Sequence, residues 1–249
     1  MKPVGITETY DPCFVDDWET RLLEANIIIS KELNDEMVGK LVAVQRNVIF
    51  HHTVTGQGGT ALEPGVKAPE TEFQQFVKLL DSGFCPSHYV LRLDPIVLIN
   101  AETQENISRV LELWAPMASK FPDSKIRCRI SIVDMYRHAR DRIRNARIDI
   151  FYDQFQAPDA VFRRAEKILS AHTGTFRFEC CAEPSLDFPG LVHCGCASIE
   201  DIRILGLDPG EYGKPEKKQR NDCMCMMKKQ ILGRKPGQCP HGCLYCFWK

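Results

Sequence analysis

The sequence predicts an α/β fold: a single incomplete, TIM-like barrel of mostly parallel strands, with a cysteine-rich C-terminal tail over the barrel mouth. Segments with strand character alternate with segments of helical periodicity, and parallel strands need such helical crossovers. The 249 residues suit one barrel-like domain. Polar residues follow several predicted strands, at the edge where barrels of this kind place their ligands.

The N-terminal part of the chain is expected to form two strands and two helices. Residues 4–10 alternate β-favouring residues, and residues 16–25 indicate a short helix. The segment 27–29 is ambiguous between helix and strand. A second helix is expected over 34–45, followed by a strand over 47–54 that is rich in β-branched and aromatic residues.

Helices and strands continue to alternate in the rest of the body. Apolar residues recur at helical spacing in three segments, namely 69–80, 107–114 and 161–169. Three strands are expected at 89–94, 126–133 and 176–182. Pro95 and Pro116 are expected to stop a strand and a helix, respectively.

The composition changes after about residue 206, where Pro, Gly, Lys and Cys replace the helical pattern. We therefore expect the incomplete barrel to occupy residues 1–206. Residues 207–249 are expected to form an iron-sulfur-binding tail that packs on the barrel.

Composition narrows the class of protein. The formal net charge is -1 and 44% of the residues are hydrophobic, which argues against global disorder. No apolar run reaches membrane-spanning length, and the first ten residues lack the apolar core of a signal peptide. We therefore expect a cytoplasmic protein. Persistent disulfides are rare in that compartment, so the seven cysteines after residue 190 indicate metal ligation.

The most informative motif is the C-x3-C-x2-C spacing of Cys239, Cys243 and Cys246 near the C-terminus. Three thiolates can hold a 4Fe-4S cluster while one iron keeps no protein ligand, whereas structural zinc sites usually have four protein ligands. The motif therefore favours an open iron-sulfur cluster. A zinc site that also uses His241 or a distant cysteine remains an alternative.

This spacing, with Tyr245 before the third cysteine, resembles the cluster loop of radical S-adenosylmethionine (SAM) enzymes. The resemblance implies that the cluster binds SAM and donates one electron, generating a 5'-deoxyadenosyl radical. A ferredoxin or flavodoxin would be the reductant. The resemblance also implies that Tyr245 lies beside the adenine, and it points to Gly58 and Gly59 as contacts of the SAM amine. Arg92 would pair with a carboxylate of SAM or substrate.

Each of these SAM-binding roles has a structural alternative. The glycines can belong to an ordinary flexible connection. Arg92 can pair with neighbouring carboxylates, such as Asp94, Asp134 or Glu183, in a purely structural network.

Several ordered motifs are similar to those of the family called domain of unknown function 1848. They lie at residues 92–96, 131–136, 181–183, 219–225 and 239–246. The resemblance runs in order from about residue 47 to the C-terminus, and more loosely near the start. It implies a C-terminal iron-sulfur motif on a barrel-like body and no known substrate. The chain has Thr7 and Glu8 where the family is expected to have an arginine pair.

The same resemblance implies a second metal site at Cys181, Cys196, Cys223 and Cys225, because these match cysteine positions of the family. Four thiolates would form a closed site that suits either a second iron-sulfur cluster or zinc; the third alternative is no metal. Cys194 is an alternative to Cys196.

Basic residues dominate the tail: Lys214, Lys217, Lys218, Arg220, Lys228, Lys229, Arg234 and Lys235. They indicate either a nucleic-acid partner, a solvated face or charge compensation beside an anionic cluster. The leading hypothesis is a radical-SAM-like enzyme. The alternatives are a zinc-binding module that contacts nucleic acid, and an iron-sulfur electron-transfer protein that does not use SAM.

Overall fold

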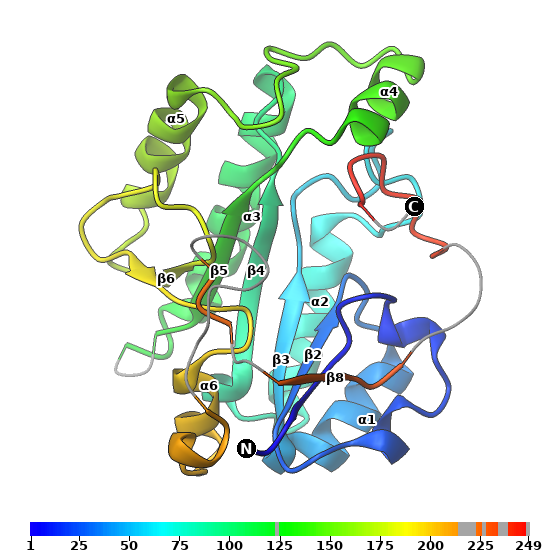
Figure 1. The fold of residues 1–249 in the computed structure, drawn as a ribbon, viewed down its shortest axis with the longest axis vertical. Helices are drawn as coiled ribbons and strands as arrows, with labels where there is room; N and C mark the ends of the chain where they lie inside the picture. The colour runs from blue at the N-terminus through cyan, green and yellow to red at the C-terminus, as the bar shows by residue number, and fades with distance from the viewer. Residues whose placement is uncertain (123–124, 214–222, 226–227, 234–238, 248–249) are drawn as a thin grey trace.

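The computed structural model of the protein describes residues 1–122, 125–213, 223–225, 228–233 and 239–247. Eight strands form one sheet in the order β7-β6-β5-β4-β3-β2-β1-β8. Every strand pair in this sheet is parallel. The predicted α/β class with parallel strands is therefore confirmed, whereas closure of the sheet into a barrel stays a prediction (Figure 1).

The strands are β1 (Val4–Ile6), β2 (Asn26–Ser30), β3 (Val48–Thr53), β4 (Tyr89–Ile96), β5 (Arg127–Ile132), β6 (Arg177–Cys180), β7 (Val192–His193) and β8 (Lys229–Ile231). The α-helices are α1 (Asp35–Val44), α2 (Pro69–Asp81), α3 (Ala101–Ala118), α4 (Arg137–Asn145), α5 (Asp159–Ser170) and α6 (Ile199–Ile204). Among these described helices, none has the length and apolar character needed to cross a membrane.

Local signals explain where the long helices begin. The Asn34 side chain accepts a hydrogen bond from the Met37 N–H at the start of α1, and Pro69 occupies the first turn of α2. Asn100 and Thr103 form a reciprocal capping box at the start of α3. These caps satisfy backbone N–H groups that have no partner within the helix.

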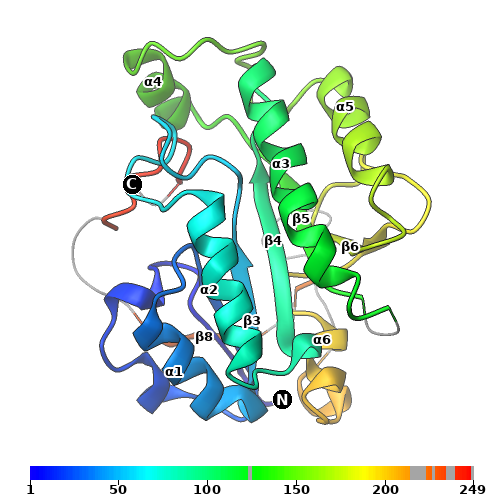
Figure 2. The same ribbon diagram turned by 180° about the vertical axis from the view of Figure 1, so that it is seen from behind.

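The alternation of side chains along the strands divides the core into two parts. On one face, Phe50 and Leu91 belong to the large cluster that includes residues of α1, α2, α3 and α5, and Figure 2 shows α1, α2 and α3 in front of that face. On the other face, Ile49 and Val90 belong to a smaller cluster with Ile202 of α6. Each such fully buried apolar side chain contributes roughly 1.5–3 kcal/mol relative to an exposed one.

Two expectations near the N-terminus need correction, and one segment left open is now assigned. Residues 18–21 form only a short 3-10 helix, because Leu22 already has an extended conformation and the chain turns toward β2. The ambiguous segment 27–29 is the middle of β2, which lies between β1 and β3. The first strand ends at Ile6, so the polar residues after it are free to form a loop.

Two prolines do not act as expected. Strand β4 continues past Pro95 to Ile96, with a cis Asp94–Pro95 peptide and a shift in its register with β5. Pro116 lies inside α3, which ends at Ala118.

The tail also differs from the expectation of an extension that only covers the barrel. Its residues Lys229–Ile231 form β8, which pairs with β1 at the end of the sheet. The boundary at residue 206 stays a prediction, but part of the tail belongs to the sheet itself.

Candidate metal and cofactor site

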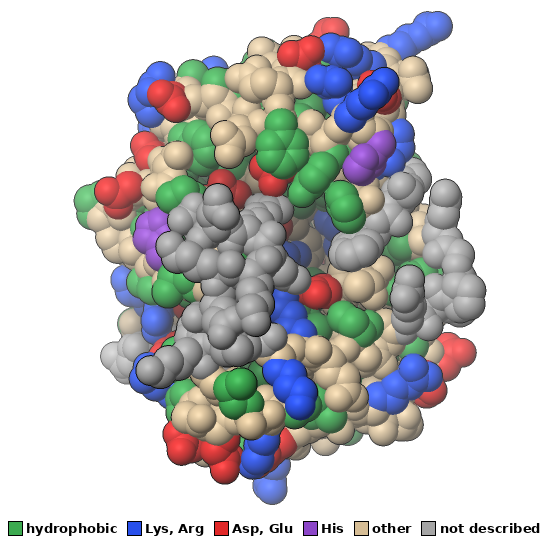
Figure 3. All heavy atoms as spheres, viewed as in Figure 1, with side chains coloured by type: hydrophobic (Ala, Val, Ile, Leu, Met, Phe, Trp, Pro, Cys, Tyr) green, Lys and Arg blue, Asp and Glu red, His purple; other side chains and the backbone are tan. Residues whose placement is uncertain are grey.

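A cavity of about 320 Å³ lies at the carboxyl ends of the strands, where parallel α/β sheets usually bind their ligands. Its wall includes residues that follow or end five neighbouring strands, among them Tyr10, Lys31, Thr53, Asp94 and Asp134. The surface is hollowed near the centre of Figure 3. The described tail residues form another part of the wall.

All three tail cysteines, Cys239, Cys243 and Cys246, line this one cavity. Cys243 is buried, and the other two are partly buried. The structure therefore brings the predicted triad to the strand ends. Their role as ligands of a metal cluster stays a prediction.

The tail loop is fastened to the body by backbone hydrogen bonds and one arginine. The Leu244 N–H donates to the Leu62 carbonyl at 2.9 Å, and the Gly65 N–H donates to the His241 carbonyl at 3.0 Å. A Cβ at Gly65 would lie 2.5 Å from the Pro240 carbonyl oxygen, so this close approach requires glycine. Arg142 of α4 donates to the carbonyls of Leu244, at 2.8 Å, and of Cys246.

His241 has partners at both ring nitrogens. Its Nε2 lies 2.8 Å from Asp11 Oδ2, and its Nδ1 lies 3.1 Å from the Gly65 carbonyl oxygen. Burial would lower the pKa of His241, but the hydrogen bond and charge of Asp11 outweigh it and the pKa is raised. Asp11, Cys13 and His241 also offer ligand atoms that lie within 4.8 Å of one another, so they form a group that could hold a metal ion. Because both ring nitrogens are bonded, His241 would have to give up one of these contacts to become a fourth ligand of a metal at the triad.

Tyr245 belongs to a buried polar cluster on the cavity wall. Its hydroxyl donates to Glu63, and Lys31 Nζ lies 2.7 Å from Glu63 Oε1 and 2.9 Å from the Tyr245 hydroxyl. Burial raises the pKa of Cys243 to about 12, while the Lys31 charge opposes this shift. Lys31 is therefore placed to favour the thiolate form that binds metals.

Arg92 lines the cavity as well, but it forms an ion pair with Asp94 and lies 3.4 Å from Thr53 Oγ1. Burial opposes its charge, yet Asp94 and the nearby thiols of Cys181 and Cys196 outweigh burial and raise the pKa of Arg92. These contacts match the structural alternative for Arg92. A role toward SAM stays a prediction.

Gly58 and Gly59 are not among the residues that line the cavity. A Cβ at Gly58 would lie 1.9 Å from the Lys67 carbonyl oxygen, and the Gly59 N–H donates to the Glu63 carbonyl at 3.3 Å. Both glycines therefore shape the loop that carries Glu63 and supports the tail. Their contact with the SAM amine stays a prediction.

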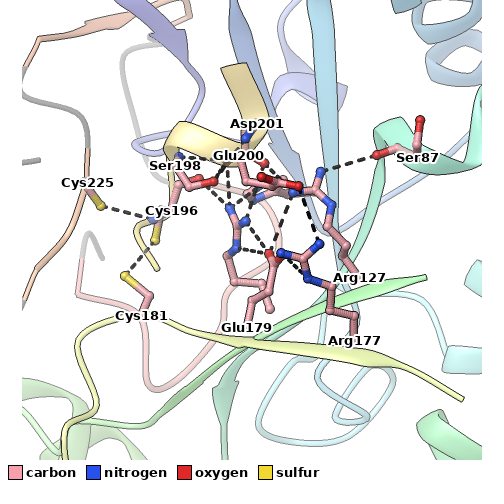
Figure 4. Close-up of polar contacts among 12 residues, drawn as sticks. Ser87, Arg127, Arg177, Glu179, Cys181, Cys196, Ser198, Glu200, Asp201 and Cys225 are labelled. Carbon is pink, nitrogen blue, oxygen red and sulfur yellow. Dashed lines mark hydrogen bonds and ion pairs between the residues drawn. The ribbon is translucent and has the colours of Figure 1, made fainter. Parts of the chain in front are cut away.

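The second predicted cysteine group converges closely. The sulfurs of Cys181, Cys196 and Cys225 lie within 4.8 Å of one another, which allows them to hold a metal ion. Cys223 is buried in the same cluster and its sulfur accepts a hydrogen bond from the Cys225 N–H. Figure 4 shows the side chains of Cys181, Cys196 and Cys225 pointing toward one another. Cys196, and not its alternative Cys194, is among the three sulfurs that converge, whereas its role as a metal ligand stays a prediction.

This cysteine group brings together segments next to the two edge strands of the sheet, β7 and β8. Cys181 follows β6 and Cys196 follows β7, whereas Cys225 precedes β8. A Cβ at Gly195 would lie 2.5 Å from the Cys225 N, so the two segments are in direct backbone contact. Hydrogen bonds from the Cys181 and Cys196 thiols, helped by the Lys229 charge, lower the pKa of Cys225 to about 3.

A buried ionic network supports the Cys196 segment. Arg129 lies 2.5 Å from Glu179 Oε2 and 3.2 Å from Asp201 Oδ2, and it donates to the Cys196 carbonyl at 2.9 Å. Arg127 pairs with Asp201 at 2.6 Å, and Figure 4 shows this cluster beside the cysteines. Burial and the Arg129 charge lower the pKa of His51 well below its usual value, so this histidine is neutral.

Sequence reasoning missed this network, the Lys31–Glu63 pair and Arg142. Alternation along β5 places Arg127 and Arg129 on the same side as Ile49 and Val90. This alternation could have indicated from the sequence that the two arginines are buried. The basic-tail prediction is largely open, because Lys214, Lys217, Lys218, Arg220, Arg234 and Lys235 lie outside the described residues.

Comparison with known proteins identifies a family without assigning an activity. No significant match was found among curated proteins or solved structures. The family described as domain of unknown function (DUF1848) matches residues 17–248, which confirms the predicted resemblance. With a match over nearly its whole length and with both cysteine groups in place, the chain belongs to the DUF1848 family.

Proposed function

We propose that the protein is a radical-SAM-like enzyme that holds a 4Fe-4S cluster through Cys239, Cys243 and Cys246. The observation that carries this proposal is that all three cysteines and the ends of five parallel strands line one cavity. A volume of about 320 Å³ is at the lower end of the range for small-ligand pockets.

The donor set fits such a cluster. Three cysteines leave one iron open. Both ring nitrogens of His241 are already bonded, to Asp11 and to the Gly65 carbonyl, so neither is free to complete a zinc site. Lys31 and Arg142 place two cations next to the loop, which suits an anionic thiolate-ligated cluster. When bound, the cluster would supply one electron to SAM, received from a reductant such as a ferredoxin or flavodoxin.

The residues of the chain would bind, orient and shield the reactants. Tyr245 presents an aromatic ring that can contact the adenine of SAM, and such stacking contributes about 1 kcal/mol beyond burial. Arg92 and Asp94 offer one positive and one negative group to the polar ends of SAM or substrate.

Anaerobic reconstitution tests the proposal. The wild-type protein should bind about four irons and four sulfides at the triad beyond those of any second site. Addition of SAM should change the electron paramagnetic resonance spectrum of the reduced protein. Cys243→Ala should abolish that response. Replacement of Cys85 by serine should retain it, because Cys85 is half-buried and is not among the residues that line the cavity.

Two other results would redirect the assignment. An unchanged spectrum with SAM, and no 5'-deoxyadenosine under reducing conditions, would favour an electron-transfer protein. Zinc in place of iron after anaerobic reconstitution would favour a zinc-binding module.

We further propose that Cys181, Cys196, Cys223 and Cys225 form a closed second site for an iron-sulfur cluster or zinc. The convergence of three of these sulfurs within 4.8 Å, with Cys223 packed beside them, supports this proposal. A closed four-thiolate site has no open position for substrate, so its role would be structural or in electron transfer.

A further inference from the structure

Four aromatic rings form a cluster beside the cavity mouth. Tyr136 lies 4.9 Å from Phe247, 5.1 Å from Phe155 and 5.7 Å from His138, measured between ring centroids. Phe155 and Phe247 remain 49% and 51% exposed, although they pack against Tyr136. Because these exposed rings are grouped and not scattered singly, they are a candidate binding surface.

The helix that begins beside these rings is strongly basic. Residues 137–147 contain five arginines and one aspartate. Arg137, Arg144 and Arg147 are exposed, and Arg144 also pairs with Asp153 at 2.5 Å. In Figure 3, hydrophobic side chains and a histidine lie between the central hollow and the Lys and Arg side chains in the region of α4. We call this combined surface the aromatic–arginine platform.

The platform continues into the cavity, because Tyr136 and Phe247 line its wall. Deeper in the wall Asp94 is paired with Arg92 and Asp134 adds a second carboxylate, so these three residues offer no excess positive charge to a phosphate group. The arginines are on the outer side, where phosphates can lie in solvent. A ligand that offers planar rings toward the cavity and anions toward α4 matches this arrangement.

We propose that the aromatic–arginine platform binds single-stranded nucleic acid. Unpaired bases stack on aromatic side chains, and arginines follow the phosphate backbone. A duplex hides its base faces and can use only the arginines. This surface includes none of the basic tail residues that the sequence suggested, and the proposal does not depend on the radical-SAM assignment.

Fluorescence anisotropy with a labelled 12-nucleotide single-stranded RNA tests the proposal on the full-length, metal-reconstituted protein. A Kd of about 1–100 μM at moderate salt is expected, with affinity falling as salt increases. The same RNA in a duplex should bind more weakly. Phe155→Ala should weaken single-strand binding about tenfold, because stacking contributes of that order per base.

Matched controls separate the platform from general effects. Phe151→Ala removes another exposed aromatic ring of the same loop. That ring packs against Arg164 and not against Tyr136, so RNA binding should not change. Arg137→Ser should weaken binding and reduce the salt dependence, whereas Arg203→Ser on the exposed side of α6 should not. Circular dichroism of each variant checks that the fold is intact.

Each other result overturns the proposal. Equal binding of duplex and single strand, or equal loss in Phe151→Ala and Phe155→Ala, would exclude stacking on the platform. Competition by AMP as effective as by the 12-nucleotide strand would assign the surface to a free nucleotide instead. Binding to anionic phosphatidylserine vesicles without binding to RNA would assign it to a membrane surface.

Discussion

Replacement of Arg129 by methionine should be the most destabilising single change in the network behind the second cysteine group. Arg129 is fully buried and contacts Glu179, Asp201 and the Cys196 carbonyl. Methionine keeps much of the apolar volume but leaves two buried carboxylates with less compensating charge. Breaking a buried ion pair in this way costs about 3–5 kcal/mol. That is a large part of the roughly 5–15 kcal/mol that stabilises a typical domain.

Urea unfolding of the reduced, metal-free protein measures this loss through the fluorescence of the buried Trp18 and Trp114. With a slope of about 2 kcal/mol per molar urea, the midpoint should fall by roughly 1.5–2.5 M. Arg177→Met is the matched control, because Arg177 is 40% exposed and lies 3.6 Å from the same Glu179. Its loss should be about 0–1 kcal/mol.

A double variant identifies the physical cause. Arg129→Met combined with Glu179→Gln removes one of the stranded charges, so it should be more stable than Arg129→Met alone. A loss below about 1 kcal/mol in Arg129→Met, or equal losses in Arg129→Met and Arg177→Met, would refute the reasoning from buried charge.

The remaining predictions concern pH and the two cysteine groups. Burial alone would raise the pKa of Asp201, but the charges of Arg129 and Arg127 outweigh burial, so the pKa is lowered. The stabilising contribution of Asp201 is therefore fully present above about pH 4 and is lost only as the pH falls further. The difference in unfolding free energy between wild type and Asp201→Asn should therefore stay constant between pH 6 and 8. A difference that changes with pH in this range would contradict the prediction. Arg142→Met should lose at least half of the triad iron on gel filtration, because two tail carbonyls lose their hydrogen-bond donor. Arg144→Met is the control and should retain the iron, because Arg144 is exposed. Equal iron in both variants would rule out a role of Arg142 in holding the tail loop. Cys181→Ser should remove the metal of the second site as measured by elemental analysis, and Cys194→Ser should not; retention of that metal in Cys181→Ser would exclude Cys181 as a ligand.

The long amphipathic elements could be predicted from sequence because their patterns are local. The segments 69–80 and 161–169 correspond to α2 and α5, and the β-favouring run at 126–133 corresponds to β5. Their apolar spacing alone determines which side faces the core. The cysteine groups were also accessible, because few other roles explain so many thiols in ordered motifs.

Long-range partners could not be predicted in the same way. Strand β8 has only three residues, and its pairing with β1 depends on contacts more than 220 positions apart in the chain. The bond between Asp11 and His241 likewise joins two ends of the chain, and nothing local to either residue indicates it. The short 3-10 helix at Trp18–Arg21 shows the reverse case, in which a local helical pattern yields to the turn that leads into β2.

Strand β8 connects the two candidate metal sites through one short segment. It begins four residues after Cys225, and the Leu232 N–H that follows it donates to the Ile6 carbonyl at 3.0 Å. Lys229 at its start raises the stability of the Cys225 thiolate and also pairs with Glu8 on the cavity wall. A metal at the second site would therefore fix the start of β8, and β8 in turn would restrict where the triad loop can lie. If both proposed centres are occupied, metal binding at Cys181, Cys196 and Cys225 would therefore influence the triad loop through β8, without contact between the two metals.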